Sequence, residues 1–226
     1  MDTTALLLAD GRFPSGGHAH SAGLEAAVAA GQVNGLPELE TFLRGRLATA
    51  GRVAAAFAAA TRRVAADEPE PAATVTLLDE ELDARTASPA LRRASRRQGR
   101  ALLRAGRATW PAPLLNRVPA HPDGYHHPVA LGLTAAAAGL SPADAALIGA
   151  YGVLTGPASA AVRLLGLDPY GTQALLARLA GACDAVARAA VADAALPPAD
   201  LPAHTAPLAD IHAENHATWE VRLFAS

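Results

Sequence analysis

Apolar residues recur at three- and four-residue intervals over most of this chain, which is the spacing of amphipathic helices. The longest run follows Pro37, a residue suited to the first turn of a helix, where its missing N–H is not needed. The stripe consists of Leu39, Phe42, Leu43, Leu47, Ala50, Val53, Phe57, Ala60 and Val64. We expect these side chains to form one buried face.

The same spacing, with start and stop signals, predicts further helices. They cover 74–85, a helix opened by Ser88-Pro89, 128–139, a helix opened by Ser141-Pro142, and 171–195. The helix opened by Ser141-Pro142 is expected to bend or break near its middle, at Gly152, Gly156 and Pro157. No strand-like alternation is present, so residues 1–196 are predicted to form an all-α, single-domain bundle of roughly eight to ten helices.

The C-terminal segment 197–226 has two parts. Four prolines between 197 and 207 predict an extended linker. Residues 208–226 carry many large apolar groups for a free tail: Ile211, Trp219, Val221, Leu223 and Phe224. They either pack on the protein's own core or dock on a partner.

Composition narrows the function further. Hydrophobic residues make up 51% of the chain and aromatic residues 4%, with much alanine, which favours closely packed helices. The formal net charge of −2 argues against a general polyanion binder. The single cysteine, Cys183, excludes an intramolecular disulfide. With neither a basic signal-like N-terminus nor a bilayer-spanning apolar stretch, we expect a soluble, cytoplasmic protein that does not bind membranes.

The segment from Leu6 to Glu25 is the most distinctive local pattern. An apolar run leads into a Pro14-Ser15-Gly16-Gly17 turn, where two glycines permit unusual backbone angles or the approach of another chain. Ser21 is a candidate N-cap for the helix that follows, and Glu25 lies near its positive end.

This segment and four others resemble motifs of the UreF family of urease accessory proteins, and they occur in the family's order. The matching segments are 13–17 (Phe-Pro-Ser-Gly-Gly) with 20–25 (His-Ser-Ala-Gly-Leu-Glu), 97–103 (Arg-Gln-Gly-Arg-Ala-Leu-Leu), 127–132 (His-Pro-Val to Gly), 159–164 (Ser-Ala-Ala-Val-Arg-Leu) and 222–226 (Arg-Leu-Phe-Ala-Ser). The resemblance covers nearly the whole chain.

The resemblance implies a homodimeric accessory factor without a cofactor. It implies that this factor binds UreD (also called UreH), the GTPase UreG and the urease apoprotein. It implies support of GTP-dependent nickel insertion into urease. The expected UreG-facing residues are Gly16, Gly17, Ser21, Glu25 and Arg163. The expected UreD-binding residues of the tail are Trp219, Arg222, Leu223 and Phe224.

Two histidine pairs, His18/His20 and His126/His127, are candidate transient contacts for nickel. A stable metal site needs three or four converging ligands, and no cysteine or carboxylate cluster accompanies either pair. We therefore expect polar loop groups or partner contacts. A histidine-based nickel-binding or storage protein remains an alternative.

Seven arginines form a basic stripe on one predicted helix: Arg92, Arg93, Arg96, Arg97, Arg100, Arg104 and Arg107. We expect a solvated face paired with carboxylates such as Asp79, Glu80 and Glu81, with an acidic partner surface as the alternative. No aromatic residues alternate with the arginines, which argues against nucleic-acid binding.

The chain carries no sign of an active site of its own. Ser15 lies in Pro-Ser-Gly-Gly rather than in a nucleophile elbow. All nineteen basic residues are arginine, so a standard phosphate-binding loop with its lysine is impossible. The sequence predicts a non-enzyme, and a helical enzyme of unknown reaction is the remaining alternative.

Overall fold

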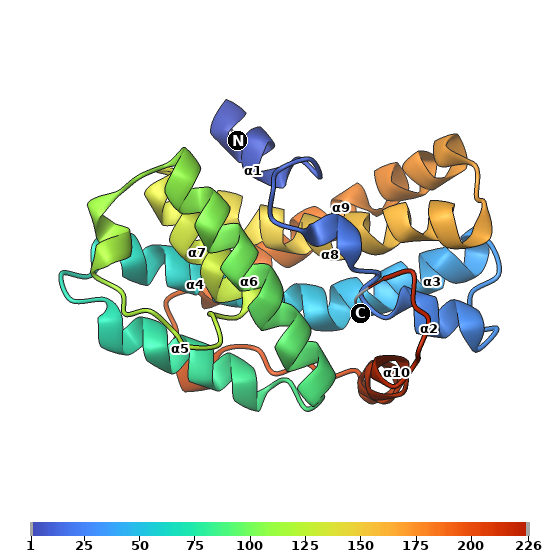
Figure 1. Ribbon diagram of the computed structural model, residues 1–226. Coiled ribbons are helices and arrows are strands. Elements are labelled where there is room, and N and C mark those ends of the chain that lie inside the picture. Colours follow the sequence, from blue (N-terminus) through green and yellow to red (C-terminus); the bar gives the residue numbers. More distant parts are fainter. Residues whose placement is uncertain (1, 225–226) are drawn as a thin grey trace.

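Ten α-helices carry the described part of the chain, residues 2–224, in the computed structural model (Figure 1). They are α1 (Thr3–Ala9), α2 (Leu24–Ala29), α3 (Leu36–Arg46), α4 (Arg52–Asp67), α5 (Ala72–Ala84), α6 (Pro89–Thr109), α7 (His127–Ala137), α8 (Pro142–Leu165), α9 (Pro169–Asp193) and α10 (Pro207–Ala217). Residues 2–224 contain no strand, so the predicted all-α class is confirmed. Ala225 and Ser226, the end of the closing motif, lie outside the described residues.

Helix α4 is the centre of the bundle and packs against α7, α8 and α9. Its buried face is largely alanine, so neighbouring backbones come close. A Cβ added to Gly132 of α7 would lie only 2.6 Å from the carbonyl oxygen of Ala58 in α4. The low aromatic content therefore goes with close contact between helix backbones.

The predicted stripe from Leu39 to Val64 runs through α3, a π-helical turn at Leu47–Gly51, and α4. Most of its large side chains are buried in the core, which confirms the predicted face: Leu39, Leu43, Leu47, Val53, Phe57 and Val64. The π turn contains five residues and joins α3 to α4. Arg46 directly precedes it.

The predicted break in α8 is wrong, because the helix continues from Pro142 to Leu165 with Pro157 inside it. A proline removes one backbone hydrogen bond, and here the buried face of the surrounding helix holds the segment in place. A Ser141–Asp144 capping box starts the helix and Gly166, with φ of 62°, ends it. Within residues 2–224, α8 is the one helix long and apolar enough to cross a bilayer, and over half of that stretch is buried in the protein.

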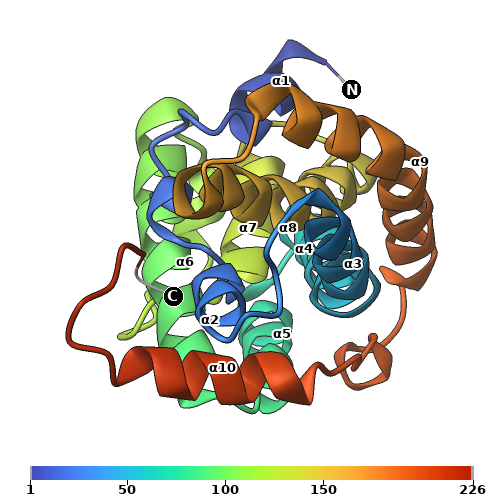
Figure 2. The same cartoon turned by 90° about the vertical axis from the view of Figure 1, so that its right-hand side faces the viewer.

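The segment after α9 is not the extended tail that the sequence predicted. It forms a short 3₁₀ turn at Pro198–Asp200 and then α10, which crosses α2 and α6 at one edge of the bundle (Figure 2). Glu214 of α10 accepts hydrogen bonds from the Ser88 hydroxyl and the Ala90 amide at the start of α6. The division of the chain into residues 1–196 and a separate unit 197–226 stays a prediction.

Candidate functional site

Three distant segments meet beside α2: the glycine turn of residues 16–19, the C-terminal part of α8, and the tail after α10. The turn reverses at Gly16, whose φ of 76° favours glycine. The two sets of candidate residues that the sequence placed on separate surfaces therefore belong to one cluster, which we call the tail junction: Glu25, Arg163, His216 and Phe224, with the backbone of His18 and Leu223.

Glu25 is the centre of the tail junction and is only 8% exposed. Its carboxylate accepts hydrogen bonds from the backbone amides of Leu223, at 2.9 Å, and Phe224, at 3.1 Å. It also lies 2.8 Å from Nε2 of His216. Glu25 thus holds the tail of its own chain, and the sequence analysis missed both this role and His216.

Ser21 is hydrogen-bonded to the backbone of Glu25. Its hydroxyl accepts a hydrogen bond from the Glu25 amide at 3.3 Å, four residues on, so the predicted N-cap role of Ser21 is wrong. The helix itself begins at Leu24, with Gly23 in the N-cap position. Ser21 is fully buried, so its contribution is to the shape of the turn rather than to the surface.

Arg163 joins the glycine turn to the tail. Its Nη2 donates to the carbonyl oxygen of His18 at 2.9 Å, and its guanidinium carbon lies 4.4 Å from the centre of the Phe224 ring. A guanidinium over an aromatic face is attracted by the electrons of the ring. The Arg163 side chain remains exposed, so it can also reach a partner.

The other tail residues divide into an inner and an outer set. The Phe224 side chain is buried, and the Trp219 ring packs on His216 with ring centres 4.8 Å apart. Arg222 and Leu223 are exposed. Of the two alternatives for residues 208–224, packing on the protein's own core is therefore what the structure contains, and docking of the outer set on a partner stays a prediction.

The fold divides only the second of the two histidine pairs. His126 is buried with Nε2 2.9 Å from Asp83, whereas His127 lines a cavity between the helices together with both members of the first pair, His18 and His20. Burial lowers the pKa of His127 to about 4. Burial, helped by nearby Arg97, lowers the pKa of His20 to about 4 as well, so both rings are neutral at neutral pH. Among residues 2–224, no three histidine, cysteine, aspartate or glutamate side chains are grouped to hold a metal ion.

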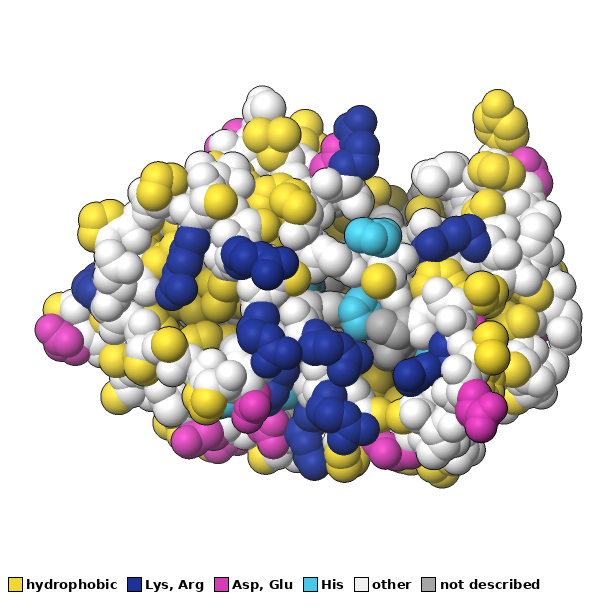
Figure 3. Space-filling model, in the orientation of Figure 1, with side chains coloured by type: hydrophobic (Ala, Val, Ile, Leu, Met, Phe, Trp, Pro, Cys, Tyr) yellow, Lys and Arg dark blue, Asp and Glu magenta, His cyan; other side chains and the backbone are white. Residues whose placement is uncertain are grey.

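The arginine stripe lies along α6 in the middle of the face shown in Figure 3. Arg96 is its inner member and forms ion pairs with Asp79 at 2.8 Å and Asp83 at 2.7 Å. Asp79 also accepts from the His126 amide, so these pairs hold α5, α6 and the start of α7 together. The exposed members of the stripe are Arg93, Arg97, Arg100, Arg104 and Arg107.

Comparison with known proteins agrees with the motif order. A sequence model described as UreF matches residues 33–180. The chain is 46% identical to a protein of Mycobacterium sp. (strain JLS) over 99% of this chain and 98% of the relative, and 45% identical to one of Mycobacterium marinum over the full length of both. It is 41% identical to one of Mycobacterium tuberculosis (strain H37Rv), over 98% of this chain and 97% of the relative. All three are named "Urease accessory protein UreF".

Proposed function

Because the chain belongs to the UreF family of urease accessory proteins, and is therefore not a catalytic enzyme, we propose that it serves urease maturation as a bridging subunit. In this role it binds UreD and UreG on the urease apoprotein and supports GTP-dependent insertion of nickel. It works as a homodimer in the cytoplasm. Nickel is the cargo of this assembly rather than a resident group of this chain.

The tail junction is the observation that supports this proposal most directly. Arg163 contacts both the glycine turn and Phe224, so one side chain connects the candidate UreG surface with the candidate UreD surface. We assign the UreG contact to the exposed rim of this junction, formed by Gly17 and Arg163. The residues behind the rim are Gly16, Ser21 and Glu25. Because Ser21 and Glu25 are buried, they determine the shape of the rim rather than contact a partner.

We assign UreD binding to the outer set of the tail. Arg222 and Leu223 are the exposed contacts, while Phe224 and Trp219 anchor the segment to its own chain. A bound UreD would then act on UreG through the Arg163–Phe224 contact. If one nucleotide state of UreG fits this rim better, assembly favours that state, and the coupling is reciprocal.

The test is an Arg163→Ala variant assayed with purified UreD, UreG and urease apoprotein. We expect weaker UreG capture and less urease activation, with UreD capture unchanged. Loss of a buried interfacial charge costs about 2–5 kcal/mol and loss of a rim pair about 0–1 kcal/mol, so the size of the effect locates Arg163 in the interface.

Arg188→Ala is the matched control, because Arg188 is an exposed arginine on α9 away from the junction. Equal UreG affinity and equal urease activation in both variants would remove Arg163 from the proposed contact.

A further inference from the structure

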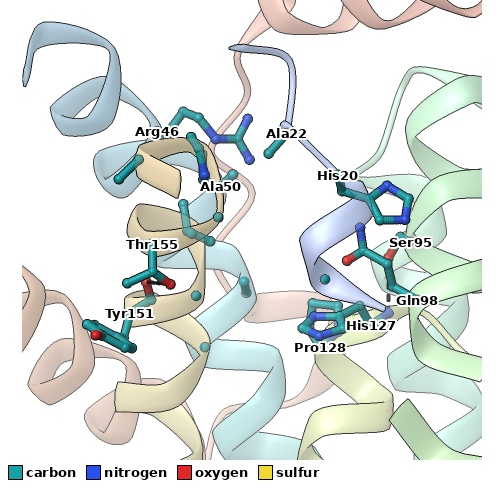
Figure 4. Close-up of a pocket in the computed structure, with 18 of the residues that line it drawn as sticks. His20, Ala22, Arg46, Ala50, Ser95, Gln98, His127, Pro128, Tyr151 and Thr155 are labelled. Atoms are coloured by element: carbon teal, nitrogen blue, oxygen red, sulfur yellow. Dashed lines mark hydrogen bonds between the residues drawn. The ribbon is translucent and has the colours of Figure 1, made fainter. Parts of the chain in front are cut away.

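A cavity of about 750 Å³ lies between α3, α4, α6, α7 and α8, and it contains a charge that the fold leaves unbalanced. Arg46, the last residue of α3, extends into it, and Figure 4 shows His20, Gln98 and His127 on the opposite wall. The rest of the lining is mostly small or apolar, including Ala50 and Leu131. A space of this size is typical of pockets that hold small molecules.

Arg46 is unusual among the inward-facing arginines. Its Nε is buried and has no hydrogen-bond partner, and no carboxylate in residues 2–224 forms an ion pair with its guanidinium. Arg52, the residue directly after the π segment, is paired with Asp193, and Arg96 is paired with two aspartates. The side chain of Arg46 as a whole is half-buried, and a buried charged nitrogen without a partner costs free energy because its loss of hydration is uncompensated.

The other charged groups of the cavity wall do not supply that counter-charge. Asp10 is paired with Arg12, and Asp210 lies beside Ser88 at the end near α10. Arg85 and Arg163 are cations already engaged with Glu81 and with the His18 carbonyl. None of the carboxylates of the wall therefore pairs with Arg46.

The backbone at Arg46 is also irregular. The π turn of Leu47–Gly51 starts at the next residue and places Ala50 in the cavity wall. Single π turns within helices occur often at functional sites because they widen the helix and redirect side chains. Here the turn falls between Arg46, which faces the cavity, and Arg52, which faces Asp193.

From this geometry we infer that the cavity binds a small organic carboxylate, with the carboxylate on the Arg46 guanidinium and the apolar part against small and apolar side chains of the wall such as Ala50 and Leu131. The planar guanidinium fork matches a carboxylate with two parallel hydrogen bonds. Gln98 supplies an amide and His127 a neutral imidazole for a second polar group of the ligand. A free anion is preferred over a partner's acidic side chain because Nε of Arg46 is buried below the protein surface.

The test is titration of the isolated chain with succinate, followed by ligand-observed NMR, against chloride at equal ionic strength. We expect saturable binding that Arg46→Gln weakens at least about tenfold, the loss typical of one good charged contact. Arg46→Lys keeps the charge without the fork and should bind at an intermediate level. Arg44→Gln is the matched control, since Arg44 lies on the same helix and pairs with Glu40 at the surface.

Arg46→Gln removes a half-buried charge that has no carboxylate partner, so the variant should fold, which circular dichroism checks. Equal succinate binding by wild type and Arg46→Gln would overturn the inference. Absence of saturable binding to the wild type would overturn it too, and would return Arg46 to a role in receiving a partner's acidic side chain. The assay uses this chain alone, so its outcome is independent of urease activation.

Discussion

Replacing Glu25 by glutamine is the sharpest test of the tail junction. The substitution keeps the size of the side chain and removes its charge and one of its two acceptor oxygens. In the native junction one oxygen accepts from the Leu223 amide, and the other from the Phe224 amide and His216. Whichever way the new amide is turned, its NH₂ group faces at least one donor.

The cost follows from these contacts. A buried donor left without an acceptor costs about 1–3 kcal/mol, and hydrogen bonds to a charged group are worth about 1.5–3 kcal/mol each. We therefore expect the closed tail to lose about 2–4 kcal/mol relative to the released tail. Since about 1.4 kcal/mol is a factor of ten, this corresponds to a population of released tail raised roughly 30- to 1,000-fold.

Amide hydrogen exchange measured by NMR reads this change directly, because the Leu223 and Phe224 amides are protected by Glu25. We expect both to exchange faster in Glu25→Gln, while amides of α4 keep their protection. Glu220→Gln, an exposed change on the same tail, is the control and should leave the rates alone. Unchanged exchange at Leu223 and Phe224 in Glu25→Gln would refute the assignment of Glu25 as the residue that holds the tail.

Three further predictions concern the core, pH and the tail. Gly132→Ala should lower the free energy of unfolding, measured in urea, by about 1–3 kcal/mol, because the added Cβ meets the α4 backbone. Gly45→Ala has open space around it and should raise that free energy by about 0.5–1 kcal/mol. Equal changes in the two variants would contradict the close contact at Gly132. Burial lowers the pKa of His127 to about 4, so as pH drops from about 6.5 to 4 the unfolded chain takes up a proton that the folded chain does not, and the free energy of unfolding should fall. His127→Asn should flatten this pH dependence. An unaltered slope in the variant would contradict the assignment of the dependence to His127. Removing residues from Leu208 onward should weaken UreD capture while helical circular dichroism largely persists, and loss of most of that signal would instead make the tail part of the folding core.

The sequence was sufficient to predict the stripe of α3 and α4 because large apolar residues there occur at local, helical spacing. The sequence was insufficient to predict α10, because this helix buries small or polar side chains and exposes its large apolar ones. The side chains that α10 buries are Ala213 and His216, whereas its large apolar residues Leu208 and Ile211 are exposed. Hydrophobic periodicity cannot detect a helix whose buried contacts are small or polar.

The tail junction was predicted in part. Sequence motifs singled out Glu25, Arg163 and Phe224, but Glu25 and His216 are 191 positions apart, and no local pattern pairs residues at that distance. The burial of Glu25 was not predicted for the same reason. The residues that cover it are supplied by a segment whose helix the pattern does not reveal.

The hydrogen bonds from Leu223 and Phe224 to Glu25 also bear on how the protein is made. The acceptor and its first donor are 198 positions apart, so Glu25 leaves the ribosome long before the amides that it requires. At synthesis rates of about 5–20 residues per second, this delay is roughly 10–40 seconds. During that interval the N-terminal segment has an uncompensated carboxylate and an uncovered flank of α2. Leu223 and Phe224 thus complete a part of the fold that is translated long before them, and a translation product that stops short of them leaves that flank open.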